Sequence, residues 1–288
     1  MKAKEYILAK QINWAQNQGI RLIGSKGNRG RPAYTATLDE NLFEPLEPFV
    51  RYYFQCADGS EILSKHGNPA KMHAVHSSSA LGVNVFQYWE RTDQVPIIAA
   101  ACGFCRSDST VSVRIVFEEK FTIDPKFRYS PNVDVVIHNT QSRKYKAFAI
   151  ECKFAEAYGG HGHGGLKQPY LELQELWEDI PTLRLLAESI SPMDDQYHYL
   201  HPAQLIKHIL GLKRQFGKGG FRLLYLWYDV LGQEGAVHRK EIENFTRFTS
   251  SDGIKFHAMS YQELIVKLAR DYRSDHPEYV KYLSERYL

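Results

Sequence analysis

Two short apolar runs, each interrupted by a carboxylate, constrain the fold of this chain more than any other feature. The runs are residues 133–137 (VDVVI) and 148–154 (FAIECKF). Side chains in a β-strand alternate between two faces. In the second run Ala149, Glu151 and Lys153 therefore share one face, while the other face is apolar. In the first run the same alternation places Asp134 on the face opposite Val133, Val135 and Ile137. Both runs therefore predict strands with an apolar face and charge on the opposite face.

The two predicted strands bring their charged positions together if they pair as neighbours. Asp134 and Glu151 then converge, and Lys153 lies alongside. Mg²⁺ is a hard cation that proteins bind through one or two carboxylates together with water and substrate phosphate. The pattern thus predicts a site suited to phosphodiester cleavage. The alternative is a cluster of surface ion pairs on a half-exposed sheet, and such pairs contribute little to stability.

The order of hydrophobic patterns predicts an α/β fold. The expected helices are residues 4–17, 44–56, 77–89, 95–102, 166–189 with a break at Pro181, 203–216, 238–248, 260–272 and a last helix from Pro277. The pattern Ser260-x-x-Glu263 predicts a capping box at the start of the helix over 260–272. The expected strands are residues 111–121, the two runs around Asp134 and Glu151, 221–230 and 254–258. Helices on both sides of a group of strands indicate a mixed sheet flanked by helices. A chain of 288 residues suits one sizeable domain.

Composition limits the class of protein. No apolar run is long enough to cross a bilayer, and the N-terminus lacks a signal-peptide pattern. The four cysteines do not suggest a disulfide framework, so we expect a cytoplasmic protein with reduced thiols. Cys102 and Cys105 form a lone C-x-x-C at the end of an apolar helical run, which favours buried structural cysteines over a redox motif. The net charge of +3 permits a nucleic-acid partner without requiring one.

The charged motif resembles that of the PD-(D/E)XK nuclease superfamily, which has the restriction-endonuclease-like fold. Here it consists of Pro131-Asn132-Val133-Asp134, sixteen intervening residues and Glu151-Cys152-Lys153. Three flanking segments are similar to an uncharacterised bacterial branch of that superfamily: residues 76–86, Phe117-Glu118 and residues 151–156 (ECKFAE). The similarity covers residues 40–270. It implies a nuclease core over residues 76–270, an N-terminal helical elaboration over 1–75 and a C-terminal helix over 271–288.

The resemblance also implies roles for the charged residues. Asp134 and Glu151 would hold Mg²⁺, for which Mn²⁺ can substitute, and Lys153 would orient the nucleophile or stabilise charge on the phosphate. A third acidic ligand is common in the superfamily. Glu118 is the first candidate, and because Glu118 and Glu119 alternate, at most one of them joins the site. A solvated strand end explains Glu118 equally well.

Gln204 and His208 lie one helical turn apart on the helix expected after the motif, so they share a face. Related nucleases use a glutamine on such a helix beside the active site, which makes Gln204 a candidate catalytic residue. A polar helix edge next to an apolar stripe is the alternative for both side chains.

Several further residues are candidates for nucleic-acid contacts. Ser78 and Asn84 lie on a helix whose start could bind phosphate, although an ordinary N-cap explains the serines nearly as well. Further candidates lie in two glycine-rich loops: His161 and His163, and Lys26, Arg29 and Arg31. Plain solvated loops remain the alternative. No cysteine or third histidine lies close to the histidine pair, so a zinc site lacks support.

Taken together, the resemblance implies a Mg²⁺-dependent endonuclease acting on DNA, with an activated water as the nucleophile. One rival interpretation is a nuclease fold that binds nucleic acid or a partner without cleaving. The other is a different metalloenzyme built on His161 and His163. The sequence leaves open whether two chains form a homodimer, and which form of DNA is the substrate.

Overall fold

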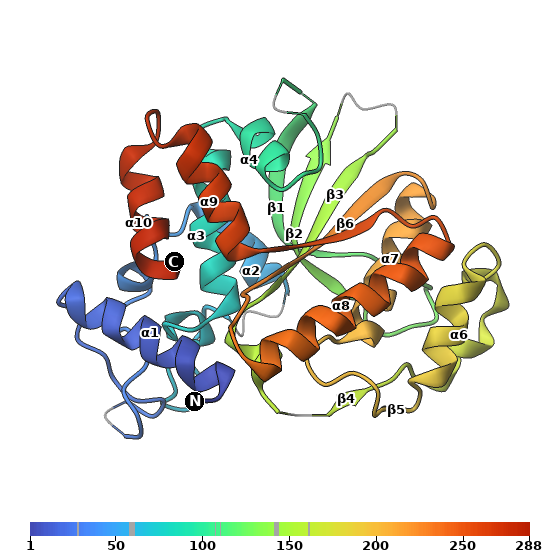
Figure 1. Cartoon of the computed structure of the whole chain (residues 1–288), viewed down its shortest axis with the longest axis horizontal. Coiled ribbons are helices and arrows are strands. Elements are labelled where there is room, and N and C mark those ends of the chain that lie inside the picture. Colours follow the sequence, from blue (N-terminus) through green and yellow to red (C-terminus); the bar gives the residue numbers. More distant parts are fainter. Residues whose placement is uncertain (28, 58–60, 107, 110, 141–143, 161) are drawn as a thin grey trace.

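A mixed β-sheet forms the centre of the molecule (Figure 1). The computed structural model describes residues 1–27, 29–57, 61–106, 108–109, 111–140, 144–160 and 162–288. Within these residues the central sheet has five strands in the order β1-β2-β3-β6-β7. The strands are β1 (Ser112–Lys120), β2 (Asn132–Asn139), β3 (Ala147–Lys153), β6 (Phe221–Trp227) and β7 (Phe256–Ser260). The first three are antiparallel, whereas β6 and β7 run parallel to β3, which confirms the predicted mixed sheet.

Helices cover both faces of this sheet, consistent with a restriction-endonuclease-like fold (Figure 1). One side carries α3 (Ser78–Arg91), α4 (Val95–Ala101) and α9 (Tyr261–Tyr272), and the other carries α7 (Pro202–Phe216) and α8 (Gln233–Ser251). Gly82 on α3 faces Cys152 on β3, while His208 on α7 meets the adjacent residue Glu151. The central strand β3 is consequently buried on both faces, so the half-exposed sheet considered as an alternative is wrong.

The two ends of the chain pack together (Figure 1). The helices at the ends are α1 (Ala3–Asn17) and α10 (Pro277–Tyr287), and α2 (Pro48–Ala57) packs on β1. Arg286 is almost fully buried at this contact, where its guanidinium donates to Gln11 and to both the carbonyl and the side chain of Asn41. The predicted boundaries at residues 76 and 270 stay a prediction. None of the described helices is both long and apolar enough to span a membrane.

The remaining elements are short. They are the helices α5 (Gln168–Glu172) and α6 (Pro181–Ser189), the 3-10 helices η1 (Asp39–Asn41), η2 (Lys71–His73), η3 (Ala155–Tyr158) and η4 (Gln174–Leu176), and the two-stranded ribbon β4 (His163–Gly164) and β5 (Met193–Asp194). The expected helix over 166–189 is thus divided into separate pieces. Pro181 lies at the start of α6, where its missing N–H costs no intrahelical bond, which confirms the predicted break.

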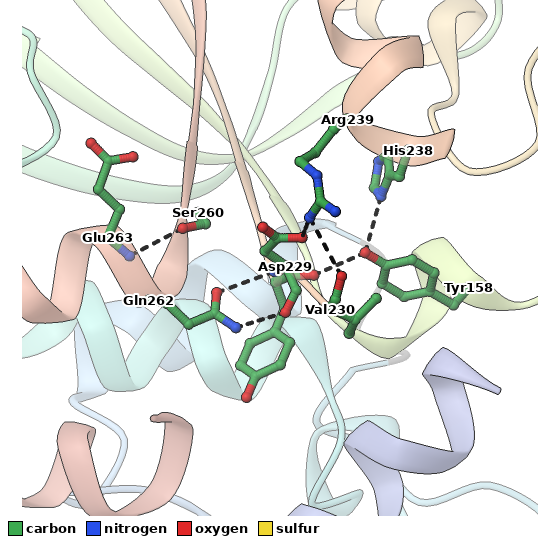
Figure 2. Close-up of polar contacts among 9 residues, drawn as sticks. Tyr158, Asp229, Val230, His238, Arg239, Ser260, Gln262 and Glu263 are labelled. Carbon is green, nitrogen blue, oxygen red and sulfur yellow. Dashed lines mark hydrogen bonds and ion pairs between the residues drawn. The ribbon is translucent and has the colours of Figure 1, made fainter. Parts of the chain in front are cut away.

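Two predicted strand boundaries are wrong, and side-chain bonds explain the first. The expected strand over 221–230 ends at Trp227, after which the chain turns away from the sheet. Figure 2 shows how this turn is held: Gln262 bonds both backbone groups of Asp229, and Arg239 pairs with the Asp229 carboxylate at 2.5 Å. The strand expected over 254–258 is β7, two residues later, because Phe256 is the residue that aligns with Leu223 of β6. The predicted cap of α9 is confirmed, since Ser260 accepts a hydrogen bond from the Glu263 N–H.

Candidate active site

Three carboxylates lie in one row across β1, β2 and β3. In the β1–β2 ladder, residues 117 and 119 align with 135 and 133, which places Glu118 beside Asp134. In the β2–β3 ladder, Val135 aligns with Ile150, which places Asp134 beside Glu151. Directly opposed residues on neighbouring strands project from the same face. The structure therefore brings together the two carboxylates that the sequence predicted to meet, with Glu118 next in the row.

The Asp134 carboxylate acts as a hydrogen-bond acceptor for the backbone of β3 at the point where β2 and β3 stop pairing. The last pair in the ladder is Val135 with Ile150, and beyond it Oδ2 of Asp134 accepts a hydrogen bond from the Cys152 N–H at 2.7 Å. The side chain is only partly exposed. Burial raises the pKa of Asp134 well above its usual value, and the negative charges of Glu151 and Glu118 add to this effect.

Glu151 is completely buried between two cationic or proton-bearing partners. The Lys153 Nζ lies 2.6 Å from its Oε1 and the His208 Nε2 lies 2.9 Å from its Oε2. Burial alone would raise the pKa of Glu151, but Lys153 and His208 outweigh it and lower that pKa to about 2. Glu151 is therefore held as a carboxylate at neutral pH.

Lys153 links this carboxylate to helix α7. Its Nζ donates a hydrogen bond to Oε1 of Gln204 at 3.1 Å. Burial works against the charge of Lys153, but Glu151 and Asp134 more than compensate and raise its pKa above the usual value. Gln204 and His208 thus contact the two motif residues from one face of α7, as their spacing on the helix predicted.

Glu118 has an unusual backbone in the middle of β1. Its φ is +53°, in the left-handed region that side chains other than glycine rarely adopt, and strained backbone of this kind clusters at functional sites. Its Oε2 accepts a hydrogen bond from the Asn132 side chain at 3.2 Å. Burial, together with the nearby Glu61 and Glu151, raises the pKa of Glu118 to about 7. Glu119 instead pairs with His138 at 2.7 Å, so only Glu118 joins the row.

A cavity of about 860 Å³ opens over this row. Its floor contains Glu118, Asp134, Lys153, Gln204 and His208. The N-terminal region forms one wall with Lys4, Tyr34, Glu61, Lys71, Ala74 and His76–Ser79. Segments around β2 and α7 form the opposite wall with Tyr129–Asn132, Tyr170, His201 and Lys207. The candidate site is therefore a polar cleft between residues that are far apart in the sequence.

The other predicted contacts have different positions. Ser78 lines the cavity, while Ser77 caps α3 by accepting a hydrogen bond from the Ala80 N–H. Asn84 is buried, and its amide bonds Phe43, Asn41 and Tyr287, so the expected nucleic-acid contact of Asn84 is wrong and its role is structural. The side-chain amide joins α3 to the end of η1, to Phe43 and to the Tyr287 hydroxyl on α10.

Among the described loop residues, Lys26, Arg29, Arg31 and His163 lie outside the cavity lining. Lys26, Arg29 and Arg31 are exposed, and their contact with nucleic acid stays a prediction. His163 stacks on His201 with ring centroids 4.5 Å apart, and only His201 lines the cavity. His161 lies outside the described residues.

The chemistry of the acidic row fits a hard divalent cation better than zinc. Among the described residues, no three His, Cys, Asp or Glu side chains are arranged closely enough to hold a metal ion as they stand. The row nevertheless offers oxygen donors, which Mg²⁺ and Mn²⁺ prefer. Asp134, Glu118 and Glu151 repel one another around the single ammonium of Lys153, so a second cation would relieve that repulsion.

Sequence patterns alone did not identify several residues of this cleft. Glu61 is held by Lys71 at 2.9 Å and by the Ser79 hydroxyl at 3.0 Å, and it comes from a segment with no motif. His201 is the N-cap residue of α7 and Lys207 lies three residues after Gln204, and both line the cavity. Their spacing from Gln204 is the sequence feature that could have identified them as residues of the cleft. Only the packing of the N-terminal region against α3 shows that Glu61 belongs to the cleft.

Comparison with known proteins agrees with this geometry. Residues 8–288 match a family described as restriction endonuclease associating with ARP. Searches of curated proteins and of solved structures found no significant match. The family match covers nearly the whole chain, including every residue of the acidic row. The chain therefore belongs to this restriction-endonuclease family.

Proposed function

We propose that this protein is a metal-dependent nuclease of the PD-(D/E)XK type that hydrolyses phosphodiester bonds of DNA. The observation that carries the proposal is that Asp134 and Glu151 lie next to each other where β2 and β3 stop pairing, with Lys153 in contact with Glu151. Asp134 and Lys153 line the polar cleft, and Glu151 is buried behind them. Family membership supports the nuclease class, and the motif residues support the chemistry.

Asp134 and Glu151 would hold the cation, with Glu118 as a third ligand. Bound Mg²⁺ would supply Lewis-acid stabilisation of the phosphate and a lower pKa for an attacking water. Oδ2 of Asp134 is already aligned by the Cys152 N–H, which fixes the carboxylate before any ligand arrives. The Glu151 side chain is already ionised before a cation binds, because Lys153 and His208 stabilise its negative charge and lower its pKa.

We propose that the ammonium of Lys153 contacts the phosphate of the substrate. Its ammonium is only partly exposed, and Gln204 and Glu151 fix it from two sides. A preorganised cation of this kind stabilises negative charge that develops on phosphate in the transition state. Gln204 is a positioning residue in this scheme, since its side-chain oxygen accepts a hydrogen bond from Lys153.

Two helix N-termini and several lysines support phosphate as the ligand. Ser78, the first residue of α3, and Gln204, in the first turn of α7, both line the cleft. Helix N-termini attract anions through their free N–H groups and the helix dipole. Lys4, Lys71 and Lys207 add positive charge at the rim. Acids at the floor and cations at the rim are the arrangement expected when a cation and a phosphate bind together.

The decisive experiment is nicking of supercoiled plasmid by the purified full chain with Mg²⁺, with Mn²⁺ and with EDTA. We expect cleavage with either metal and none with EDTA. Asp134→Asn should abolish cleavage, because the amide keeps the size of the side chain but removes the charge. Glu119→Gln is the matched control, since it neutralises an acid on the adjoining strand that lies outside the cleft.

Two results would contradict the proposal. One is full cleavage by Asp134→Asn, and the other is cleavage by the wild type that EDTA does not affect. Binding of DNA without cleavage under every metal would instead favour the non-catalytic nuclease fold. Thermal unfolding of each variant shows whether a loss of activity comes from a loss of structure.

A further inference from the structure

A second, smaller cavity adjoins the active-site cleft. It has a volume of about 430 Å³ and is lined by Lys126–Tyr129 and by residues from Lys167 to Leu173. Tyr129 and Tyr170 line both cavities, so the two cavities adjoin at these rings. We call this second cavity the side groove. A polymer bound in the cleft could extend directly into it.

The side groove is positively charged. Its lining contains three cations and one acid, namely Lys126, Arg128 and Lys167 against Glu172. All four side chains are exposed. Lys207, on the cleft side of the same boundary, lies near Lys167: burial lowers the pKa of Lys207, and the charge of Lys167 lowers it further. Positive charge therefore continues from the cleft into the groove, which suits a chain of phosphates.

Aromatic rings lie between these charges. Tyr129 is 70% exposed, although it carries a large ring. The Arg128 guanidinium lies 5.1 Å from the centre of that ring. Phe127 and Tyr170 pack on each other with centroids 4.1 Å apart, which fixes the inner wall of the groove. Exposed rings among cations are the combination with which proteins bind single-stranded nucleic acid, because bases stack on the rings while cations contact the backbone.

We propose that the side groove binds an unpaired DNA strand next to the bond to be cut, with Tyr129 as the stacking platform. The inference rests on the proposed nuclease function and adds the form of the substrate. An unpaired strand is favoured over a duplex because base faces are open for stacking only when they are not enclosed in a helix. Contacts of cations with phosphate and of rings with base faces do not depend on the base, so binding should be insensitive to sequence.

The test measures binding apart from cleavage. Fluorescence anisotropy with a labelled single-stranded oligodeoxynucleotide, and with the duplex of the same sequence, is recorded in EDTA. Tyr129→Ala should weaken single-strand binding by about fivefold to a hundredfold, the range expected for loss of one stacked base. Tyr129→Phe should retain most of the affinity, because the ring remains. Tyr52→Ala is the matched control, since Tyr52 is 62% exposed and lines neither cavity.

A second measurement tests the charges. Replacing Arg128 with Ala should reduce the salt dependence of single-strand binding by about 0.7 in the slope of log K against log salt, the value for one lost phosphate contact. The same change at Arg106, an exposed arginine that lines neither cavity, should leave the slope unchanged.

Several outcomes would overturn the inference. They are equal binding by Tyr129→Ala and Tyr52→Ala, equal weakening of duplex and single strand by Tyr129→Ala, and competition by an acidic peptide that matches competition by DNA. These outcomes are separate from failure of the proposed catalysis. If Asp134→Asn cleaves normally while Tyr129→Ala loses single-strand binding, the result supports strand binding in the side groove and contradicts the catalytic role of Asp134.

Discussion

The imidazole of His208 contacts Glu151 where both side chains are almost completely buried. Nε2 of His208 lies 2.9 Å from Oε2 of Glu151, and the side chains are 1% and 0% exposed. Because Lys153 occupies the other oxygen of Glu151, both oxygens of this carboxylate have a partner. Orientation of a metal ligand by a second side chain is a general feature of metal sites. We therefore assign His208 as the residue that positions Glu151.

Removal of the His208 side chain should weaken both the site and the fold. His208→Ala leaves a buried charge with one partner instead of two, which should destabilise the protein by about 1–3 kcal/mol. Loss of a contact behind a metal ligand commonly lowers metal affinity by about 10- to 100-fold. We thus expect the Mg²⁺ concentration for half-maximal cleavage to rise by that factor, and titration of Mg²⁺ in the nicking assay measures it.

His257→Ala is the control for that variant. Its Nε2 bonds the Cys102 carbonyl at 2.9 Å, on the side of the sheet covered by α4, so its loss should lower stability without changing the Mg²⁺ requirement. An unchanged Mg²⁺ requirement in His208→Ala would show that His208 has a structural role alone.

The strained backbone at Glu118 predicts opposite effects of glycine at two adjacent positions. A residue other than glycine with a positive φ costs about 1 kcal/mol, and glycine adopts that conformation without penalty. Glu118→Gly should therefore stabilise the protein by about 1 kcal/mol, with a further gain from removal of a buried acid. Glu119→Gly, at an ordinary strand position, should destabilise it by about 1 kcal/mol. Urea unfolding of both variants measures the difference, and destabilisation by Glu118→Gly would contradict the strained conformation.

Glu118 and Glu119 should also differ in their effect on cleavage. Glu118→Gln removes a charge from the acidic row but keeps its hydrogen-bonding size, so we expect a lower rate that additional Mg²⁺ or Mn²⁺ partly restores. Glu119→Gln should cleave at the wild-type rate, because its partner is His138 outside the cleft. Equal rates for wild type and Glu118→Gln, at low and at high metal, would exclude Glu118 as a ligand.

Buried His238 predicts a loss of stability in mild acid. Nδ1 lies 3.3 Å from the Tyr158 hydroxyl (Figure 2). Nε2 lies 3.0 Å from the Tyr225 hydroxyl, and the Tyr158 hydroxyl donates to the Tyr228 carbonyl. A neutral imidazole with its proton on Nδ1 satisfies this chain. Burial, together with the charge of Arg239, lowers the pKa of His238 to about 3 from an ordinary 6.5.

The sign of the pH effect follows from proton binding. Between pH 6.5 and 3 the unfolded chain takes up a proton at His238 while the folded chain does not, so acid favours unfolding in this range. At pH 5 the contribution is about 2 kcal/mol. His238→Gln should therefore make the free energy of unfolding less dependent on pH between 7 and 5, as measured in urea. His198→Gln, which changes an exposed imidazole, should leave the slope as it is. If the free energy of unfolding depends on pH equally in His238→Gln and in wild type, His238 does not cause the loss of stability in acid.

Local sequence patterns predicted those parts of the fold that depend on neighbours along the chain. Alternation placed Glu151 and Lys153 together on β3, and the spacing of Gln204 and His208 placed both on one face of α7. The serine and glutamate at the start of α9 formed the expected cap. These outcomes follow from the geometry of a strand or helix, which repeats every two or 3.6 residues whatever surrounds it.

Errors arose where distant parts of the chain compete for the same groups. Asn84 lies at the predicted position on its helix, but the packing of the N- and C-terminal segments buried its amide. The expected strand from Phe221 ends early because Gln262 forms a hydrogen bond with the Asp229 backbone and Arg239 forms an ion pair with the Asp229 carboxylate. Neither partner is adjacent in sequence, so no local pattern could have indicated them.

By itself, the sequence determined that two strands each carry an acid on one face and that a lysine accompanies the second acid, because side-chain direction along a strand is a property of the backbone. Only the tertiary structure decided that Glu118 joins the row and that His208 contacts the buried Glu151 carboxylate. It also decided that Lys4, Glu61 and Tyr129 line the cleft. Those contacts join segments separated by long stretches of chain. Their formation depends on how the whole apolar core closes, which is a collective property of the packed molecule.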